Sequence, residues 1–393
     1  MHVLFVADGD SKYGAPRSMY QLIENLVFYD ENIKVSVVLT KKTDYEDKLR
    51  KLGCDVYVAP YVPYYQRIPE RKTIYIIKYV LRGLKYFYGR LFSVKILSKQ
   101  LDINSIDLIH SNSLREDFGV ILSVRYNIPL VWHIREFGDL DYQCYSYRNN
   151  YIDFIKQADA QYIAISRAVK EHWVKKGIEQ ARITHIYNIV TIPPIENVEK
   201  KKHNYIDIIM MGSLHETKGQ RQIIEAIALL GDAYKQKVHL DIVGDSKTGY
   251  DKVLKRIVEK EGIAKNVSFL GYKKDFYNNL VNYDVGVICS KSEALGRVTM
   301  EYMLAGLPVL ASNSGANPEL VSDGKNGLLY KWNDIKDLAR RLEYIVDNTH
   351  ELKEMGIYAK KYVTEHFKKE ELISKVEAVY EKAMSSNKDT KIC

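Results

Sequence analysis

Residues 288–330 decide the fold, and they read ICSKSEALGRVTMEYMLAGLPVLASNSGANPELVSDGKNGLLY. The runs at 285–290 and 308–312 are short, apolar and partly β-branched, which is typical of parallel strands buried on both faces. Between them, Gly296 allows the backbone to turn tightly before a helical pattern begins. The stretch therefore predicts a strand, a turn, a helix and a second strand in succession.

The turn at Gly296 is suited to an anion. If the helix begins here, the amides of residues 295–298 lie at its N-terminus, where free N–H groups and the helix dipole attract negative charge. Arg297 adds a fixed positive charge and a fork of donors, which phosphate oxygens accept well. The turn therefore predicts a diphosphate site.

Two glutamates flank the predicted diphosphate site. Glu293 precedes the helix and Glu301 lies about one to two turns into it, so both can face the same cleft. Such carboxylates can accept hydrogen bonds from ribose or sugar hydroxyls. The alternative is that Glu293 is a solvated loop acid and Glu301 a surface residue of an amphipathic helix. The apolar neighbours of Glu301 in VTMEYMLA make a solvated position there less favourable.

The order of residues 290–309 resembles a family signature. The pattern S-x-x-E-A-x-G-R-V-x-x-E-x-M-x-A-G-x-P-V is similar to that of the retaining GT-B glycosyltransferases of family four, also called glycosyltransferase group 1. The resemblance implies an α/β GT-B fold, in which two Rossmann-like doubly wound domains face a central cleft. It also implies that a nucleoside-diphosphate sugar binds at the carboxyl ends of the strands.

Length and pattern agree with two domains. A chain of 393 residues exceeds the usual size of a single core, and strand and helix patterns alternate along it, which favours parallel sheets. We expect an N-terminal acceptor-binding domain over residues 1–190 and a C-terminal nucleotide-sugar-binding domain over residues 205–369. Paired prolines and a lysine run separate them. The resemblance implies that a helix at 370–385 crosses back to the N-terminal domain.

The resemblance extends to residues 211–226, which read MGSLHETKGQRQIIEA. The family has a glycine-initiated turn here that ends in Lys-Gly before a helix, and this implies that Lys218 contacts the donor phosphates. The alternative is a solvated lysine in the first helical turn, where a cation opposes the helix dipole unless it meets an anion. Many relatives carry arginine where Ser213 stands, and we expect Arg297 to supply the missing charge.

A glycine-containing loop is expected at residues 8–18, DGDSKYGAPRS, between the first strand and a helix. The family places such a loop against the donor sugar and the acceptor. Gly14 and Ala15 resemble its tight segment, and Arg17 could meet phosphate. Glycine after a first strand is common in α/β proteins, so this loop alone is a weak signal.

His133 is expected at the end of a strand near the transferred sugar, as the resemblance implies for VWHIREF, although a lone histidine is more often structural. His110 lies at a similar strand end. Asn188 matches the asparagine of an Asn-Gly-Val segment found in the family, but its neighbours depart from the family pattern. The residues expected to act in catalysis are Glu293, His133, Lys218 and Arg297. Those expected to bind the donor are Gly14, Ala15, Arg17, Gly212, Ser213, Lys218, Leu295, Gly296, Arg297, Val298 and Glu301.

No metal and no cofactor are expected. Two Asp-x-Asp matches occur, Asp8 with Asp10 and Asp139 with Asp141, and in another glycosyltransferase fold such a pair holds a divalent metal. A GT-B site meets the leaving-group charge with amides, lysine and arginine instead. The cysteines form no C-x-x-C pair and have no histidine cluster nearby, so we expect free thiols and no zinc site. They are Cys54, Cys144, Cys289 and Cys393.

The resemblance implies a reaction. A sugar would move from a UDP- or GDP-linked donor to a hydroxyl of a glycan or lipid-linked acceptor, in bacterial cell-surface polysaccharide or glycolipid biosynthesis. The acceptor would attack from the face that the diphosphate leaves, so the anomeric configuration is retained, and a phosphate oxygen could accept the proton. The alternatives are a GT-B sugar-nucleotide epimerase and a catalytically silent nucleotide-binding partner subunit.

Residues 61–99 are strongly basic and aromatic, with nine Lys or Arg and one acid, Glu70. Lys78, Arg82 and Lys85 share one helical face. An interfacial helix within residues 67–99, drawn to anionic lipid, is one interpretation, and an ordinary amphipathic helix with a solvated basic face is the other. No nucleic-acid-binding motif accompanies the charge. With no long apolar run and no signal-peptide pattern, a cytoplasmic protein is expected, or one peripheral on the inner face of the membrane.

Overall fold

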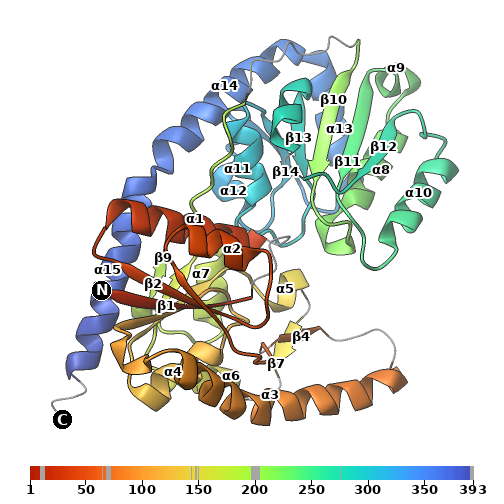
Figure 1. The fold of residues 1–393 in the computed structure, drawn as a ribbon. Helices are drawn as coiled ribbons and strands as arrows, with labels where there is room; N and C mark the ends of the chain where they lie inside the picture. The colour runs from red at the N-terminus through yellow and green to blue at the C-terminus, as the bar shows by residue number, and fades with distance from the viewer. Residues whose placement is uncertain are drawn as a thin grey trace. The chain divides into compact units, whose positions relative to one another are not determined.

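Two parallel sheets organise the chain (Figure 1). The computed structural model describes residues 1–8, 14–63, 65–67, 72–142, 144–146, 148, 150–195, 204–274 and 276–389. The chain divides into two units, one of Met1–Ile189 with Lys368–Cys393 and one of Val190–Phe367. Each unit has its own sheet.

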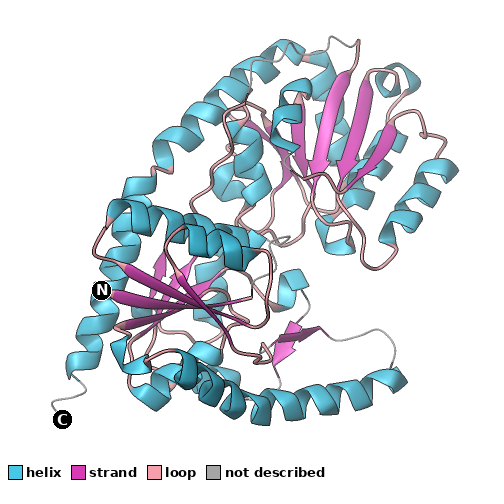
Figure 2. Ribbon diagram, in the orientation of Figure 1, coloured by secondary structure: helices cyan, strands magenta, loops and turns pink. Residues whose placement is uncertain are grey.

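The sheet of the first unit has the strand order β3-β2-β1-β5-β6-β8-β9, and neighbouring strands are parallel. Strand β1 is buried along its whole length, as expected when helices cover both faces of a sheet (Figure 2). The order reverses between β1 and β5, which makes their carboxyl ends a topological switch point. The strands are β1 (His2–Ala7), β2 (Lys34–Leu39), β3 (Asp55–Val58), β5 (Leu108–Ser111), β6 (Leu130–Ile134), β8 (Gln161–Ala164) and β9 (Ile183–His185).

The other elements of the first unit are helices and one short antiparallel pair of strands. The pair, β4 (Tyr65–Arg67) with β7 (Cys144–Ser146), lies outside the main sheet. The helices are α1 (Gly14–Tyr29), α2 (Tyr45–Lys51), α3 (Lys72–Gln100), α4 (Phe118–Tyr126), α5 (Asp139–Tyr142), α6 (Tyr151–Lys156), α7 (Arg167–Lys175) and α15 (Lys369–Asp389), with the short 3₁₀ helices η1 (Ile103–Ser105) and η2 (Gln180–Arg182).

Helix α15 packs on the first unit although it follows the second unit in the chain. Its buried Tyr380 lies beside β5, where the hydroxyl is 2.7 Å from His110 Nδ1. At its beginning, Tyr29 Oη donates to Glu370 Oε1 at 2.6 Å. The helix runs to Asp389, beyond the end at residue 385 that the sequence predicts.

The sheet of the second unit has the order β12-β11-β10-β13-β14-β15, again with parallel neighbours, and its switch point lies between β10 and β13. The strands are β10 (Ile206–Met211), β11 (Val238–Val243), β12 (Val267–Gly271), β13 (Val285–Ile288), β14 (Val309–Ser312) and β15 (Gly327–Tyr330). The helices are η3 (Glu216–Lys218), α8 (Gln220–Leu229), α9 (Asp232–Lys235), α10 (Tyr250–Lys260), η4 (Phe276–Asn282), α11 (Arg297–Leu304), α12 (Asn317–Leu320), α13 (Ile335–Asp347) and α14 (Thr349–His366).

A close approach of helix to sheet holds α11 in place. Gly286 on β13 faces Tyr302, and a Cβ at this position would overlap the tyrosine ring. The Tyr302 hydroxyl accepts a hydrogen bond from the Met211 amide at 2.7 Å, at the end of β10. Helix α11 is therefore fixed to both strands of the switch point.

The predicted α/β class with two doubly wound Rossmann-like sheets is confirmed (Figure 2). The strand, turn, helix and strand predicted within residues 285–312 appear as β13, α11 and β14. One boundary is wrong. Residues 14–18, which the sequence places in a loop, form the first turn of α1, where the fixed φ of Pro16 is tolerated.

Candidate active site

The loops after β10 and β13 form a candidate anion site at the switch point of the second sheet. A close backbone contact brings them together, because Gly219 has a φ of +73° and a Cβ here would overlap the Cys289 carbonyl oxygen. Gln222 Nε2 donates to the same oxygen at 3.2 Å. As a result, Lys218 Nζ lies 2.9 Å from Glu293 Oε2. Two residues 75 positions apart thus form an ion pair across the switch point.

Glu293 is held as a carboxylate. Burial alone would raise its pKa, but the nearby Lys218 charge and hydrogen bonds from Lys218, Ser290 and the Gly296 backbone lower the pKa below its ordinary value. The Glu293 side chain is 15% exposed and that of Lys218 is 35% exposed. The alternative of a solvated loop acid is therefore wrong, and Glu293 can accept hydrogen bonds from a ligand.

A second loop fixes the backbone of Glu293. The Ala316 amide donates to the Glu293 carbonyl at 2.8 Å. Gly315 has a φ of +60°, and a Cβ there would lie only 2.6 Å from the Glu293 nitrogen and oxygen. The loop before α12 can approach this closely only because residue 315 is glycine.

Helix α11 begins at Arg297, directly after Gly296, whose φ is +76°. The Met300 amide donates to the Gly296 carbonyl at 3.2 Å, so the amides before it lie in the first turn, where a helix provides no acceptor for them. Thr299 in this turn is buried, and its hydroxyl oxygen has no hydrogen-bond partner among the described residues. Such an N-terminus is suited to an anion, and the diphosphate site stays a prediction.

Glu301 is buried rather than on the surface, since only 2% of the residue is exposed. Its Oε1 lies 3.4 Å from both Tyr277 Oη and Arg297 Nη2. The alternative of a solvated helix residue is therefore wrong. The assignment of Glu301 to ribose stays a prediction.

The structure thus brings most of the predicted donor-site residues of the second unit together at one switch point. Gly212 follows β10 and has a φ of +144°, and Ser213 beside it is exposed. Leu295 is buried and Val298 half-buried at the start of α11. The role of Arg297 as a substitute for an arginine at position 213 stays a prediction.

The predicted residues of the first unit lie in two places. Gly14, Ala15 and Arg17 occupy the first turn of α1, and the Ala15 carbonyl accepts a hydrogen bond from Asn112 Nδ2 at 3.3 Å. Residues 9–13 of the predicted loop lie outside the described residues. His133 lies on β6 and is only 3% exposed.

His133 belongs to a buried polar cluster that the sequence did not predict. Arg135 joins the cluster by donating to Asn112 Oδ1 at 2.8 Å and to Asn188 Oδ1. Arg135 Nη2 and His110 Nε2 lie 3.2 and 3.3 Å from His133 Nδ1. Burial and the Arg135 charge hold the pKa of His133 well below its ordinary value, so the ring is neutral. Its Nε2 has no hydrogen-bond partner among the described residues.

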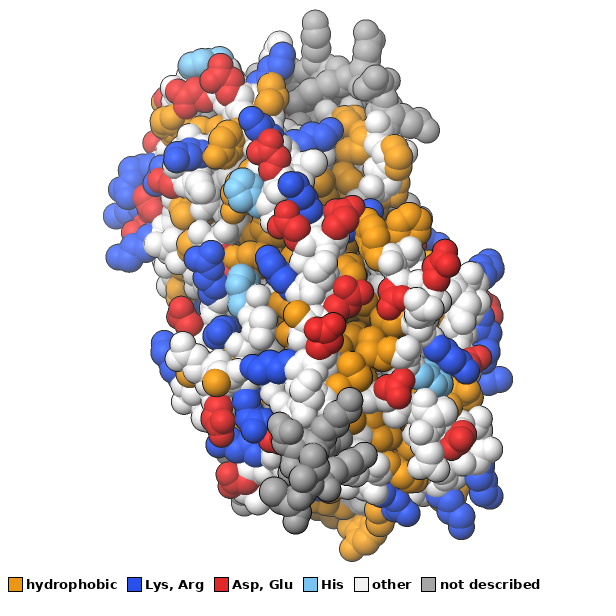
Figure 3. Space-filling model, turned by 90° about the vertical axis from the view of Figure 1, so that its left-hand side faces the viewer, with side chains coloured by type: hydrophobic (Ala, Val, Ile, Leu, Met, Phe, Trp, Pro, Cys, Tyr) orange, Lys and Arg blue, Asp and Glu red, His pale blue; other side chains and the backbone are white. Residues whose placement is uncertain are grey.

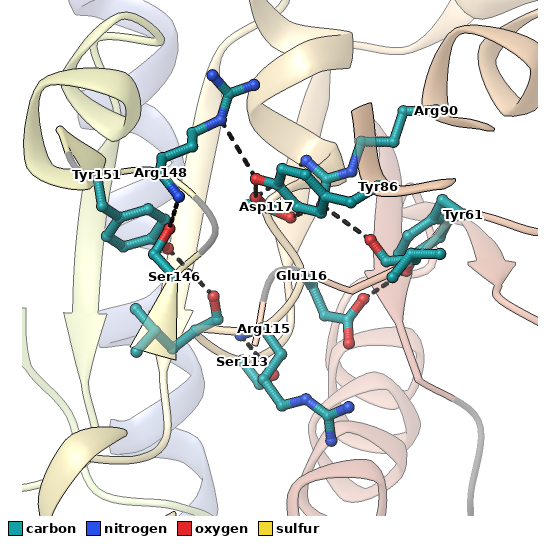
Figure 4. A network of polar contacts seen from close by, with 12 residues as sticks. Tyr61, Tyr86, Arg90, Ser113, Arg115, Glu116, Asp117, Ser146, Arg148 and Tyr151 are labelled. Carbon is teal, nitrogen blue, oxygen red and sulfur yellow. Dashed lines mark hydrogen bonds and ion pairs between the residues drawn. The ribbon is translucent and has the colours of Figure 1, made fainter. Parts of the chain in front are cut away.

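A second buried cluster lies after β5, at the switch point of the first sheet (Figure 4). Tyr61 Oη donates to Glu116 Oε2 at 2.5 Å, and Tyr86 Oη donates to Asp117 Oδ2 at 2.6 Å. Arg90 forms an ion pair with Asp117. The acidic pair in SNSLRED directly after a strand was the signal that could have identified this cluster.

The acids of one Asp-x-Asp match have structural partners. Asp139 Oδ2 lies 2.6 Å from Lys176 Nζ, and Asp141 accepts from the amides of Phe137 and Gly138 at 2.9 and 2.7 Å. Asp10 of the other match lies outside the described residues. No group of three or more His, Cys, Asp or Glu suited to a metal occurs within the part of the chain that the structure describes. The expected lack of a metal stays a prediction.

Two of the four cysteines are described with their side chains. Cys54 and Cys289 are free and buried. Burial raises the pKa of the Cys54 thiol to about 11 and that of Cys289 to about 12. Cys393 and the side chain of Cys144 lie outside the described residues.

Residues 72–100 of the basic stretch form α3. Arg90 on this helix is buried and paired with Asp117, so it does not belong to a solvated basic face. Arg82 and Lys85 are exposed, whereas the side chain of Lys78 lies outside the described residues. Among the helices that the structure describes, none is long and apolar enough to cross a membrane.

Comparison with known families finds two matches that together extend from residue 44 to residue 362. Residues 192–362 match the family model of the glycosyl transferases group 1. Residues 44–192 match the model named Glycosyltransferase Family 4. The boundary between the two matches falls close to the boundary between the two structural units.

Individual relatives agree with these matches. The chain is 30% identical to the putative glycosyltransferase EpsD of Bacillus subtilis over 42% of this chain and 44% of EpsD. It is 33% identical to the lipopolysaccharide core biosynthesis glycosyltransferase LpsE of Rhizobium meliloti over 36% of this chain and 40% of LpsE. The chain thus matches less than half the length of either relative.

The fold is shared with a solved structure. The crystal structure of HepE from Anabaena, in complex with UDP and glucose, superimposes with a TM-score of 0.72 at 22% sequence identity. The superposition covers 96% of this chain and 98% of HepE. The superposition includes both units, and it identifies the fold as GT-B.

Proposed function

The chain belongs to the glycosyltransferases of group 1, and we propose that it moves a sugar from a UDP- or GDP-linked donor to a hydroxyl of a glycan or lipid-linked acceptor with retention of configuration. The observation that carries this proposal is the Lys218–Glu293 pair across the switch point, beside the N-terminus of α11. Cation, carboxylate and helix N-terminus together match a diphosphate joined to a polyhydroxylated sugar.

The donor would bind by its diphosphate to the amides at the start of α11. Arg297 and Lys218 would add positive charge to the phosphates, Glu301 would accept from the ribose hydroxyls, and Glu293 from the sugar hydroxyls. The shared fold of HepE, which is described with UDP and glucose, is consistent with a nucleotide ligand in this fold.

Donor binding would reorganise the Lys218–Glu293 pair. The Lys218 ammonium is a flexible donor on a long stem, so it can turn toward a phosphate while the carboxylate turns toward a hydroxyl. Because the pKa of Glu293 is lowered, the carboxylate is ionised at neutral pH and acts as an acceptor rather than as an acid.

Leaving-group stabilisation is the main task of these groups. Negative charge develops on the departing diphosphate, and preorganised cations and amides aimed at it lower the barrier, usually as a large electrostatic contribution. Lys218, Arg297 and the helix amides would do this without a metal or another cofactor. The acceptor would attack from the same face, and a phosphate oxygen would take its proton, so no side-chain base is assigned.

The setting we propose is bacterial cell-surface polysaccharide or glycolipid biosynthesis, for a cytoplasmic protein that can associate with the inner face of the membrane. The lipopolysaccharide role in the name of LpsE supports this setting. The acceptor would be bound by the first unit.

Transfer assays with a panel of UDP- and GDP-sugars test the proposal. Lys218→Ala should lower kcat/KM by about tenfold or more, since each factor of ten needs only about 1.4 kcal/mol of lost transition-state stabilisation. Lys291→Ala is the matched control, because Lys291 is an exposed lysine in the neighbouring loop, and it should leave kcat/KM unchanged. Equal activity of the two variants would remove Lys218 from the site.

Two further outcomes separate the alternatives. Isomerised sugar after incubation with a nucleotide-sugar alone would identify an epimerase. Nucleotide binding, seen as a raised melting temperature, without turnover on any acceptor would favour a silent partner subunit, because a ligand stabilises the folded state to which it binds.

A further inference from the structure

The outward side of α3 is apolar. Its exposed large hydrophobic residues are between 44% and 71% exposed, and they lie close together on one helix. In the rest of the described chain, such residues occur singly or in adjacent pairs. Clustered exposure of this kind marks an interaction surface. The residues of this outward face are Val80, Leu81, Leu84, Phe87, Tyr88, Leu91 and Phe92.

The outward face is distinct from the side that packs on the first unit. At 3.6 residues per turn its seven residues fall within an arc of about 140°. The buried residues Tyr86, Arg90, Val94 and Leu97 fall outside this arc, over about 80° of the helix surface. An ordinary surface helix would present polar groups where α3 presents leucine, valine and phenylalanine. Helix α3 is therefore apolar on two sides.

The charge of α3 has a single sign. Residues 72–100 contain no Asp or Glu, and the exposed Lys85, Lys95 and Lys99 lie in or beside the apolar arc. On the face of the molecule shown in Figure 3, in contrast, basic and acidic side chains are interspersed. The partner of α3 must therefore combine negative charge with hydrocarbon.

An anionic lipid bilayer has this combination of properties. Its headgroups attract lysine and arginine, and aromatic and aliphatic side chains lying in the interface contact acyl chains. A second copy of the chain would bring two faces of like charge together. A nucleic acid would leave the leucine and valine side chains without an apolar partner.

Buried contacts hold α3 to the loops that follow β3 and β5 (Figure 4). Arg90 pairs with both oxygens of Asp117, with Nη1 3.0 Å from Oδ2, and its Nη2 donates to the Val62 carbonyl at 2.9 Å. The Arg90 guanidinium also lies 3.6 Å from the centre of the Tyr86 ring. Asp117 directly precedes α4, at the end of the loop that follows β5. These contacts fix the orientation of α3 relative to the switch point of the first sheet.

We propose that the outward face of α3 binds in the plane of an anionic bilayer, and that the Arg90–Asp117 pair holds the carboxyl edge of the first sheet at a fixed orientation to the membrane. Where it concerns the acceptor, this inference rests on the proposed function. The first unit then receives a lipid-linked acceptor from the membrane surface.

Co-sedimentation of the full chain with vesicles, without nucleotide-sugar, tests the surface. The protein should sediment with phosphatidylglycerol-containing vesicles at low salt and not with phosphatidylcholine alone, and added salt should release it. The double variant Leu84→Glu/Leu91→Glu should reduce the bound fraction by about tenfold, since it places two charges in the apolar arc. Val124→Glu is the matched control, because Val124 on α4 is 52% exposed in the same unit.

Three results would overturn the inference. They are a wild-type chain that stays in the supernatant, a double variant that binds as the wild type does, and a dimer in light scattering that the double variant abolishes. Circular dichroism of each variant verifies folding, and Lys95→Gln/Lys99→Gln provides a second probe that should weaken the salt dependence.

Turnover on a water-soluble acceptor, measured on the same preparations, separates this inference from the proposed function. A double variant that keeps this turnover but no longer binds vesicles supports both. Wild-type turnover without vesicle binding rejects the membrane surface alone. Vesicle binding that is sensitive to the double variant, without turnover, rejects the proposed function alone.

Discussion

The switch points of the two sheets occupy equivalent positions in their units, and each has a cation paired with a carboxylate. In the second unit, Lys218 and Glu293 have side chains that are 35% and 15% exposed. In the first unit, Arg90 and Asp117 are 2% and 0% exposed. The partly exposed pair can exchange its partners for a ligand, whereas the buried pair cannot separate without leaving a charge in the protein interior. The same kind of contact thus suits binding in one unit and anchoring in the other.

The strongest test of this contrast is Arg90→Met. The substitution leaves Asp117 buried without its guanidinium, so it should lower the free energy of unfolding of the first unit by about 3–5 kcal/mol. Tryptophan fluorescence in denaturant reports on this unit alone if Trp332 is first replaced by phenylalanine, because Trp132 and Trp173 are both in the first unit.

Arg82→Met is the control for this test, since Arg82 is exposed on the same helix and should change stability by no more than about 0.5 kcal/mol. Similar losses in the two variants would mean that the buried pair does not anchor α3.

Glu301→Ala tests the binding side of the contrast. Loss of the buried carboxylate about one turn into α11 should reduce turnover by about tenfold or more, equivalent to about 1.4 kcal/mol of transition-state stabilisation. Glu301→Gln, which keeps an acceptor oxygen, should recover part of the activity. Wild-type turnover in Glu301→Ala would exclude this residue from the donor site.

Opposite pH dependences should distinguish the glutamates of the two switch points. Burial and the nearby Asp8 raise the pKa of Glu116 from 4.5 to about 8, so the folded state keeps a proton that the unfolded state releases. Stability should therefore fall as pH rises from 4.5 toward 8, and Glu116→Gln should reduce this slope.

The lowered pKa of Glu293 acts in the other direction. Its contribution to stability is present above the ordinary pKa of 4.5 and is lost as pH falls below that value, through the lowered folded-state pKa. Melting temperatures between pH 3 and 8 would measure both effects. Equal slopes for Glu116→Gln and the wild type above pH 5 would contradict the buried, protonated Glu116.

The smallest expected effect is the stability change of Lys218→Ala. A pair with this exposure contributes about 1 kcal/mol or less, so the variant should unfold nearly as the wild type does while its donor affinity falls. Hydrogen exchange of the β10 and β13 amides measures the stability of the second unit. A thermal shift with nucleotide-sugar measures the donor affinity. A stability loss comparable to that of Arg90→Met would erase the difference between the two pairs.

The sequence predicted the strands well because buried parallel strands are continuous apolar runs. The stretch from β13 to β14 combines such runs with a glycine turn, so its local structure could be recognised directly. The three-residue strands β4 and β7 were missed, since YQR and CYS are too short and too polar to show a periodic pattern.

The site was predicted only in part because side-chain pairing depends on residues distant in sequence. Lys218 and Glu293 could each be identified as candidate site residues. Their contact could not be predicted, because they are 75 positions apart in the sequence. The basic stretch gave no sign that Arg90 is buried, because helical periodicity cannot reveal that Asp117 lies opposite to it. His133 was expected near a cleft, and the polar cluster that Arg135 forms around it was not foreseen.

The packing of α15 has a consequence for synthesis of the protein. Tyr380 covers His110 on β5, and Leu372, Ile373 and Val376 of the same helix are buried. The first unit therefore lacks part of its core until α15 has been synthesised, whereas Val190–Phe367 is contiguous. Domains usually complete folding in the order in which they are translated. In this chain, the unit that begins first must finish last.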